Sequence, residues 1–189
     1  MAPDDEPDGR PAVTGATIWL TGLPSSGKTT IASALAERLS AEGHRVEVLD
    51  GDDVRTLLSA DLGFSRADRF ANVQRIAYAA ELLASHGVKV LVSVIAPFAD
   101  SRAAVRARHA AAGTEYLEIH VATPVELCSC RDVKGLYAKQ AAGELTGLTG
   151  ADDPYEAPVS LESRLETHPQ TVDESVDALW ALLVASGLA

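Results

Sequence analysis

One short segment, GLPSSGKTT (residues 22–30), constrains the fold of this chain more than any other feature. It follows an apolar run at residues 16–21 and precedes a stretch whose apolar residues recur at helical spacing. In that context, Gly-x-x-x-x-Gly-Lys-Thr is the P-loop pattern, whose glycines let successive backbone N–H groups point at phosphate oxygens. The segment therefore predicts a strand, a phosphate-binding turn and a helix, in that order.

Apolar runs and helical patterns alternate along the rest of the chain. Strands are expected at residues 17–20, 46–49, 88–95 and 116–121, and helices at 28–42, 53–59, 70–85 and 101–112. Two more helices are expected to begin with capping threonines, Thr123 and Thr171, each followed three residues later by Glu. This alternation predicts an α/β fold of the P-loop NTPase type, a parallel sheet with helices on both faces.

The parallel sheet also predicts where a ligand binds. Ligands of such sheets lie beyond the carboxyl ends of the strands. We therefore expect residues 22–29, 50–52 and 96–98, each of which follows a predicted strand, to converge on one site.

The N-terminal end of the chain and one internal segment differ in composition from the rest. Residues 1–14 are acidic and Pro-rich and predict a disordered tail, so that residues 15–189 form a single domain. Residues from about 132 to 158 are Gly-rich and polar and predict a mobile lid. The N-terminus does not resemble a signal peptide, and no apolar run approaches membrane-spanning length. We therefore expect a cytoplasmic protein without a membrane partner.

The charge balance excludes one class of partner. Sixteen Lys and Arg residues against 27 Asp and Glu residues give a formal net charge of -11. A surface this acidic repels nucleic-acid phosphates, so general DNA or RNA binding is not expected. Two cysteines, Cys128 and Cys130, are too close in sequence to staple the fold and form a poor zinc signature.

The P-loop residues carry the first functional prediction, binding of ATP with Mg²⁺. Lys28 is expected to neutralise the β- and γ-phosphates, and Thr29 is expected to ligate Mg²⁺. The candidate ATP-binding residues are Gly22, Ser25, Ser26, Gly27, Lys28, Thr29, Thr30 and Arg131.

The segment LDGDDVR (residues 49–55) places carboxylates just past the second predicted strand. An alcohol that accepts a phosphoryl group needs a nearby carboxylate to take its proton, and Mg²⁺ needs oxygen ligands. Asp52 is the candidate for both roles, and Asp50 is the second candidate carboxylate. The alternative is that residues 50–52 only form a turn and a helix cap.

Two cationic segments remain. GFSRADRFANVQR (residues 63–75) combines Arg66, Arg69 and Arg75 with Phe64 and Asn72, which suits a phosphate or sulfate and a base. The predicted lid carries a second basic cluster, residues 131–139, of the kind that closes over transferring phosphates. The alternatives are a solvated charged loop and a helix with a solvated basic face.

Taken in order, these segments resemble the adenylyl-sulfate (APS) kinase family. The resemblance rests on GLPSSGKTT, LDGDDVR, GFSRADRFANVQR, IAPF, CSCRDVKGLYAK and TGADDPYEAP, and it spans residues 19–158. It implies transfer of the γ-phosphate of ATP to the 3′-hydroxyl of adenosine 5′-phosphosulfate, giving PAPS and ADP. It also implies a homodimer as a possible assembly.

The resemblance assigns roles to residues. Asp52 matches the catalytic aspartate, and Lys28 is the second catalytic candidate. The candidate acceptor-binding residues are Asp50, Arg55, Phe64, Arg69, Asn72, Ile95, Pro97, Lys134, Gly135, Leu136 and Leu148.

The chain departs from the family pattern around the acceptor. Leu148 stands where the family has a Phe that stacks on adenine opposite Phe64, Ala71 and Gln74 replace an acid and a cation, and Ala96 replaces a Ser. These changes leave open a related kinase that phosphorylates a different nucleotide or small-metabolite hydroxyl. A regulatory nucleotide-binding module is disfavoured by the intact P-loop and Asp52, and a GTPase by the absence of an Asn-Lys-x-Asp segment.

Overall fold

The computed structural model describes residues 14–168 and 170–189, so the predicted acidic tail, apart from Thr14, lies outside the described residues. Within them, a five-stranded sheet runs in the order β2-β3-β1-β4-β5, and every adjacent pair of strands is parallel. The strands are β1 (Ala16–Thr21), β2 (Val46–Asp50), β3 (Lys89–Ser93), β4 (Glu115–Val121) and β5 (Ser163–Leu165).

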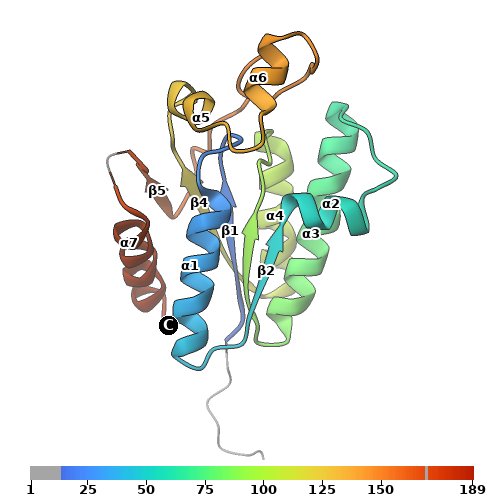
Figure 1. Cartoon of the computed structure of the whole chain (residues 1–189). Helices are drawn as coiled ribbons and strands as arrows, with labels where there is room; N and C mark the ends of the chain where they lie inside the picture. Colours follow the sequence, from blue (N-terminus) through green and yellow to red (C-terminus); the bar gives the residue numbers. More distant parts are fainter. Residues whose placement is uncertain (1–13, 169) are drawn as a thin grey trace, which may run out of the picture.

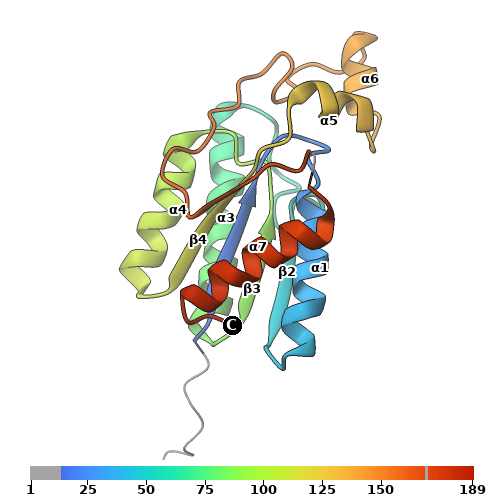
Figure 2. The ribbon, with the colours of Figure 1, turned by 90° about the vertical axis from the view of Figure 1, so that its left-hand side faces the viewer.

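Helices cover both faces of this sheet, as the sequence predicts (Figures 1 and 2). They are α1 (Lys28–Ala41), α2 (Gly51–Leu58), α3 (Arg66–Ser85), α4 (Ala99–Ala112), α5 (Val125–Arg131), α6 (Leu136–Ala141) and α7 (Val172–Ala185). One face packs against α1 and α7, and the other packs against α3 and α4. The short helices α5 and α6 lie together beyond the carboxyl end of β4.

The alternation of side chains along β1 builds both halves of the core. Ile18 and Leu20 join the cluster with α1 and α7, whereas Trp19 joins the cluster with α3 and α4. All residues of β1 are buried because the strand lies in the middle of a sheet covered on both faces. This burial explains why the central strands are continuous apolar runs in the sequence.

Two predicted helix starts are wrong, each for a local reason. Helix α3 begins at Arg66 rather than near residue 70, because Ser65 and Asp68 form a reciprocal capping box. Helix α5 begins after Pro124 without a side-chain cap, and the hydroxyl of Thr123 instead donates to the carbonyl oxygen of Ser26. The predicted capping box of Thr171 and Glu174 is confirmed.

The segment that leads from β4 back to the sheet contains elements that the sequence patterns missed. Helix α6 lies within residues 132–158, the predicted lid, which we call the lid segment, and β5 follows it at the edge of the sheet. Both are too short to show a periodic pattern. Within the described ranges, no helix combines the length and apolar character needed to span a membrane.

The core makes a direct prediction about stability. Leu35 of α1 is fully buried between the sheet and α7, so Leu35→Ala is expected to lower the free energy of unfolding by about 2–5 kcal/mol. Urea denaturation of the purified protein measures this loss. Leu57→Ala is the matched control, because Leu57 is 81% exposed and its truncation is expected to change stability by no more than about 0.5 kcal/mol. Equal losses in the two variants would contradict this description of the core.

Candidate active site

A cleft of about 780 Å³ lies at the carboxyl ends of the strands, between the P-loop, α2, the start of α3 and the lid segment. The residues after β1, β2 and β3 converge there, as predicted from the parallel sheet. Most predicted site residues line it: Ser25, Ser26, Gly27, Lys28, Thr29, Thr30, Asp50, Asp52, Arg55, Phe64, Arg69, Asn72, Ile95, Pro97, Arg131, Lys134 and Leu136. Gly22, Gly135 and Leu148 do not line it.

The P-loop backbone is shaped for an anion. Ser25 and Gly27 have positive φ angles of 60° and 101°, which curl the chain into the first turn of α1. That turn carries no acidic residue and no side-chain cap, so its N–H groups are left to bind a phosphate. Positive φ is costly for residues other than glycine, and Ser25 therefore marks backbone held by its surroundings.

The ammonium group of Lys28 lies inside the P-loop. Its Nζ donates to the carbonyl oxygens of Gly22 at 3.0 Å and Leu23 at 2.7 Å. Burial lowers the pKa of Lys28 to about 8, because a charged amine loses hydration there. The lysine is thus held where a phosphate would restore a partner of opposite charge.

The P-loop is fastened to the far half of the sheet through one carbonyl group. The carbonyl oxygen of Ser26 accepts hydrogen bonds from Thr123 Oγ1 at 2.8 Å, Thr167 Oγ1 at 3.4 Å and Arg131 Nη1 at 3.4 Å. Sequence reasoning missed Thr123 and Thr167 as site residues. Single threonines far apart in the chain give no pattern that could have revealed them.

The magnesium-binding candidates are Thr29 and a neighbouring carboxylate. Thr29 Oγ1 donates to Asp50 Oδ2 at 2.7 Å and lies 3.1 Å from Ser93 Oγ. The carboxylate in contact with Thr29 is therefore that of Asp50, which also caps α2 by accepting from the backbone N–H of Asp52. Mg²⁺ bound together with nucleotide phosphates needs only one or two protein oxygens, and this pair fits that requirement.

The carboxylate of Asp52 faces the lid segment. Asp52 lies in the first turn of α2, and its Oδ2 forms an ion pair with Lys134 Nζ. Both side chains are more than half exposed, so solvent screens the attraction and the pair contributes little to stability. The pair instead places the predicted catalytic carboxylate and the predicted lid cation in contact.

Phe64 presents an aromatic face in the cleft. The ring is 69% exposed, and the guanidinium of Arg55 lies 4.1 Å from its centroid, with that of Arg69 at 5.7 Å. Arg55 also donates to the carbonyl oxygens of Leu62 and Gly63, which fixes the loop that carries Phe64. An exposed ring steadied by cations is suited to stacking on a base.

Arg69 joins α3 to the lid segment. Its Nη2 donates to the carbonyl oxygen of Gly147 at 2.7 Å and lies 3.3 Å from Asp153 Oδ2, while its Nη1 donates to Thr149 Oγ1 at 3.1 Å. Leu148, expected at the acceptor site, lies in the middle of this turn but points elsewhere. It is 6% exposed and packs with Cys128 and Tyr137.

The three arginines of residues 63–75, expected to act together, are separated in the structure. Arg66 pairs with Asp100, and Arg75 forms a bidentate pair with Asp61, so only Arg69 lines the cleft. Asn72 does line it, and its buried Oδ1 has no hydrogen-bond partner among the described residues. An unsatisfied buried amide oxygen in a cleft is suited to receiving a donor from a ligand.

The lid segment begins with its own cap. Asp132 ends α5, and its carboxylate accepts from the backbone N–H groups of Ala138 at 2.9 Å and Tyr137 at 3.1 Å. These hydrogen bonds hold the pKa of Asp132 below its usual value. Tyr137 in turn donates to the carbonyl oxygen of Pro24, so α6 is tied to the P-loop. Gly135, the N-cap of α6, has a left-handed backbone conformation and lies in the turn between α5 and α6.

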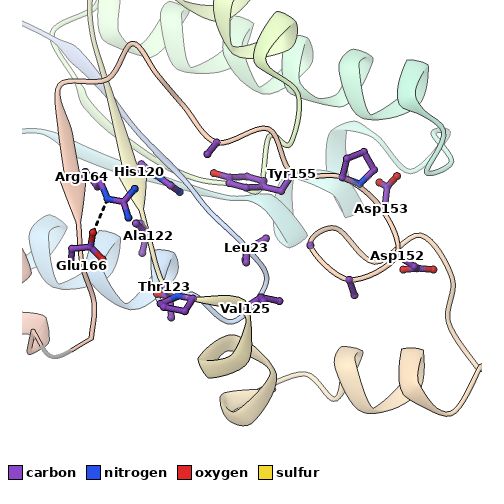
Figure 3. A pocket seen from close by; sticks show the side chains of 16 residues that line it. Leu23, His120, Ala122, Thr123, Val125, Asp152, Asp153, Tyr155, Arg164 and Glu166 are labelled. Carbon is purple, nitrogen blue, oxygen red and sulfur yellow. Dashed lines mark hydrogen bonds and ion pairs between the residues drawn. The ribbon is translucent and has the colours of Figure 1, made fainter.

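A second cavity, of about 670 Å³, lies behind the P-loop between β4, β5 and the lid segment (Figure 3). His120 and Tyr155 lie side by side in it, with ring centroids 5.8 Å apart, and Arg164 pairs with Glu166 on the side of β5. Burial lowers the pKa of His120 to about 4, so the imidazole is neutral at pH 7. None of the residues predicted for the site lines this cavity.

Comparison with known proteins identifies the family of this chain. The family model for adenylylsulphate kinase matches residues 14–166. The chain belongs to the adenylylsulphate kinase family. A probable adenylyl-sulfate kinase of Synechocystis sp. (strain ATCC 27184 / PCC 6803 / Kazusa) is 49% identical over 90% of this chain and 94% of its own length. The adenylyl-sulfate kinase of Myxococcus xanthus (strain DK1622) is also 49% identical, over 89% of each chain.

A solved member of the family has the same fold. The Mycobacterium tuberculosis APS kinase CysC, in complex with AMPPNP and APS, superposes with a TM-score of 0.87 and 45% sequence identity. The match covers 90% of this chain and 98% of that one. The P-loop kinase fold predicted from the sequence is thereby confirmed.

The burial of His120 predicts a pH dependence of stability. The pKa of His120 is lower in the folded protein than in the unfolded chain, so unfolded molecules bind the proton first as the pH falls below about 6.5. The stability contributed by neutral His120 is present above that pH and is lost as the pH falls toward 4. Between pH 7 and pH 5 the loss is expected to be about 2 kcal/mol.

Urea denaturation of the wild type and of His120→Gln at both pH values measures this share. The variant is expected to lose about 2 kcal/mol less than the wild type between pH 7 and pH 5. His86→Gln, at an exposed position, is the control and is expected to follow the wild type. The same loss in all three proteins would contradict the assignment to His120.

Proposed function

We propose that this chain transfers the γ-phosphate of ATP to the 3′-hydroxyl of adenosine 5′-phosphosulfate, giving PAPS and ADP. One observation carries the proposal: a single cleft contains a P-loop at one side and an exposed aromatic ring with cations at the other, and it is also lined by Asp52, whose carboxylate pairs with Lys134. Phosphoryl transfer needs this arrangement, because donor and acceptor must meet in line.

The donor side holds ATP through the P-loop. The N–H groups at the start of α1, with Lys28, bind the phosphates, and Arg131 adds a cation from the end of α5. Thr29 and Asp50 would hold Mg²⁺, which, when bound, neutralises charge on the β- and γ-phosphates. Asp52 as a direct metal ligand stays a prediction.

Asp52 acts as the general base. Its carboxylate takes the proton of the 3′-hydroxyl as that oxygen bonds to the γ-phosphorus and the bond from phosphorus to the leaving oxygen of ADP breaks. The ion pair with Lys134 must loosen for this, and the transferring phosphate offers Lys134 a replacement anion. Lys134 of the lid segment thereby moves from the carboxylate of Asp52 to the transferring phosphate, and Asp52 becomes free to accept the proton.

The acceptor side recognises an adenosine nucleotide. Phe64 offers its face to the base, Asn72 offers an unsatisfied amide oxygen, and Arg69 and Arg55 provide positive charge for the phosphosulfate. Two of the departures from the family pattern, Leu148 and Gln74, do not line the cleft and so give no support to another acceptor. Leu148 is packed inside the lid segment, and Gln74 donates to the carbonyl oxygen of Ser101 on α4.

Opening and closing of residues 132–158 is part of the proposal, since the turn at Arg69 and the contact of Tyr137 with the P-loop are hydrogen bonds that can break and reform. A homodimer and a cytoplasmic location stay predictions. A hexameric APS kinase from Thiobacillus denitrificans, 34% identical with a TM-score of 0.71 over 94% of this chain and 30% of that chain, supports self-association.

The reaction is tested by ADP release. A coupled assay with ATP, Mg²⁺ and APS is expected to show rapid turnover that falls to background when APS or Mg²⁺ is omitted. The product is identified by its phosphate on the 3′-hydroxyl. ADP release that does not depend on APS, or that responds better to another nucleotide, would contradict the proposed acceptor.

The base is tested by one substitution. Asp52→Asn removes the proton acceptor and keeps the shape, so kcat is expected to fall by about 10²–10⁴-fold while ATP still binds. Steady-state kinetics and calorimetric titration with ATP measure the two effects. Asp53→Asn, at the exposed neighbouring residue, is the matched control and is expected to retain kcat. Unchanged turnover in Asp52→Asn would remove Asp52 from the chemistry.

A further inference from the structure

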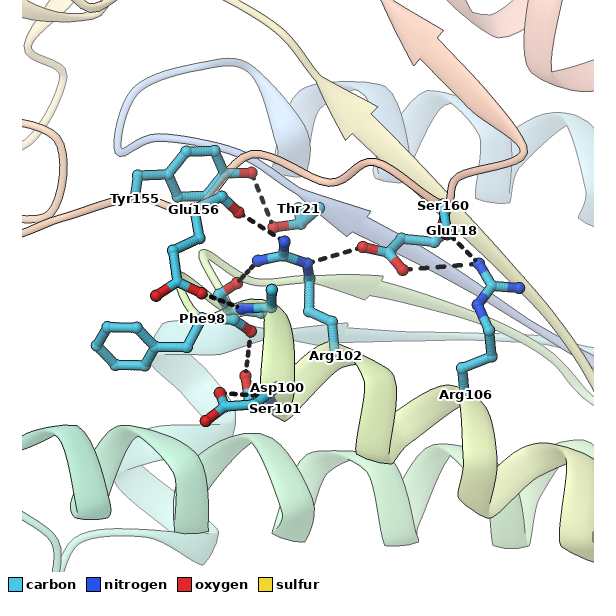
Figure 4. Close-up of polar contacts among 12 residues, drawn as sticks. Thr21, Phe98, Asp100, Ser101, Arg102, Arg106, Glu118, Tyr155, Glu156 and Ser160 are labelled. Atoms are coloured by element: carbon cyan, nitrogen blue, oxygen red, sulfur yellow. Dashed lines mark hydrogen bonds and ion pairs between the residues drawn. The ribbon is translucent and has the colours of Figure 1, made fainter.

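Arg102 is a buried arginine outside the cleft, with a side chain only 3% exposed (Figure 4). From α4 its guanidinium reaches three separate segments. Nε donates to Glu118 Oε1 on β4 at 2.8 Å, Nη1 to the carbonyl oxygen of Ala96 at 2.7 Å, and Nη2 to the carbonyl oxygen of Glu156 at 2.6 Å. A planar guanidinium can hold several acceptors in fixed directions, which an ammonium group cannot do.

The segment that contains Ala96 is a wall of the cleft. Ile95, Ala96 and Pro97 line the cleft after β3. Ala96 has a φ of 42°, a left-handed conformation that is unfavourable for a residue with a Cβ and needs surrounding support. Arg102 supplies such support at Ala96, and Thr21 Oγ1 donates to the carbonyl oxygen of Ile95 at 2.5 Å.

The segment that contains Glu156 is the end of the lid segment, where the chain returns to the body of the protein. The backbone N–H of Glu156 donates to the carbonyl oxygen of Pro97 at 2.8 Å. The carboxylate of Glu156 accepts from the backbone N–H of Ala99 at 2.7 Å, in the first turn of α4. Tyr155, the preceding residue, places its hydroxyl 3.1 Å from Thr21 Oγ1. These hydrogen bonds tie the end of the lid segment to the cleft wall and to the start of α4.

Stability alone does not explain why Arg102 is buried. Taking two charges out of water costs about as much as their attraction returns, so a buried ion pair is weak evidence of a stabilising role. Arg102 is also not the sole positive charge beside Glu118 among the described residues, because Arg106 Nη2 lies 3.6 Å from the other carboxylate oxygen of Glu118. Among the described residues, Arg102 is the side chain that binds the carbonyl oxygens of both Ala96 and Glu156, in addition to the direct hydrogen bond from the Glu156 N–H to Pro97.

We propose that Arg102 is a positioning residue for the acceptor: it holds the wall formed by residues 95–97 and the end of the lid segment in one fixed relation, and so sets the shape of the acceptor half of the cleft. The proposal rests on the proposed function for its kinetic test and on geometry for its structural test. A small misplacement of such a wall is costly, since a shift of about 1 Å can lower a rate by about 10²-fold.

The kinetic test compares two arginines of the same helix. Arg102→Lys keeps the charge beside Glu118 but cannot reach Ala96 and Glu156 together, so the KM for APS is expected to rise about tenfold, with a much smaller change in the KM for ATP. Arg106→Lys is the matched control. Arg106 pairs with Glu162 at 2.7 Å and donates to the carbonyl oxygen of Ser160, away from the cleft, so its KM for APS is expected to stay unchanged.

A second pair of variants tests the same connection from the lid segment. Glu156 is half-exposed, and its removal leaves no buried charge without a partner. Glu156→Ala loses the acceptor for the Ala99 N–H and is expected to raise the KM for APS. Glu156→Gln keeps an acceptor oxygen for the Ala99 N–H and is expected to keep the KM for APS near its wild-type value. These variants test the connection between the wall and the lid segment if Arg102→Lys fails to fold, and a wild-type KM for APS in Glu156→Ala would contradict the importance of that connection for the acceptor.

The structural test needs no substrate. Hydrogen exchange of the free protein is expected to quicken at residues 95–99 and 155–157 together in Arg102→Lys, and in neither segment in Arg106→Lys. If the wild type shows no APS-dependent ADP release, the proposed function fails, but this measurement still tests the connection.

Two results would overturn the proposal. One is Arg102→Lys with wild-type exchange and a wild-type KM for APS. The other is a loss of the same size in both arginine variants and for both substrates, which is what a general structural role predicts.

Discussion

The attachment of the P-loop to the rest of the sheet is the constraint on which the site depends. The carbonyl oxygen of Ser26 is held by Thr123, Thr167 and Arg131, which come from the end of β4, the segment after β5 and the end of α5. A phosphate site made of backbone N–H groups binds well only if those groups are already in place. The polar contacts at Ser26 hold the N–H groups of the P-loop in place, and the buried strand β1 holds the start of the P-loop.

Three polar connections then bring the acceptor half of the cleft to the donor half. Arg69 ties α3 to the turn at residues 147–149, Lys134 ties the lid segment to Asp52, and Arg102 ties the cleft wall to Glu156. Each joins a part of the lid segment to a different element of the body. The apolar cluster of Leu148, Tyr137 and Cys128 adds a packing contact to these polar connections. The polar connections can break and reform, and the proposed opening of the lid segment requires this.

Much of this arrangement could be predicted from local sequence. The central strands are buried on both faces and so are continuous apolar runs, and the P-loop pattern places the phosphate site without any tertiary information. Predictions of helix starts were wrong where a side chain can hydrogen-bond either to a neighbouring backbone group or to one far away in the chain. Thr123 has the pattern of a helix cap but bonds to Ser26, while Ser65 caps α3 inside a stretch that resembles a loop.

By itself, the sequence determined the α/β fold, the family and the residue types at the cleft, because these depend on periodicity and on short motifs. Only the tertiary structure decided which of them meet. It set Asp50 rather than Asp52 against Thr29, turned Leu148 into the lid segment, and joined Ala96 to Glu156 through Arg102. Such contacts join residues far apart in the chain, and their geometry follows from how helices and strands pack, which no local pattern records.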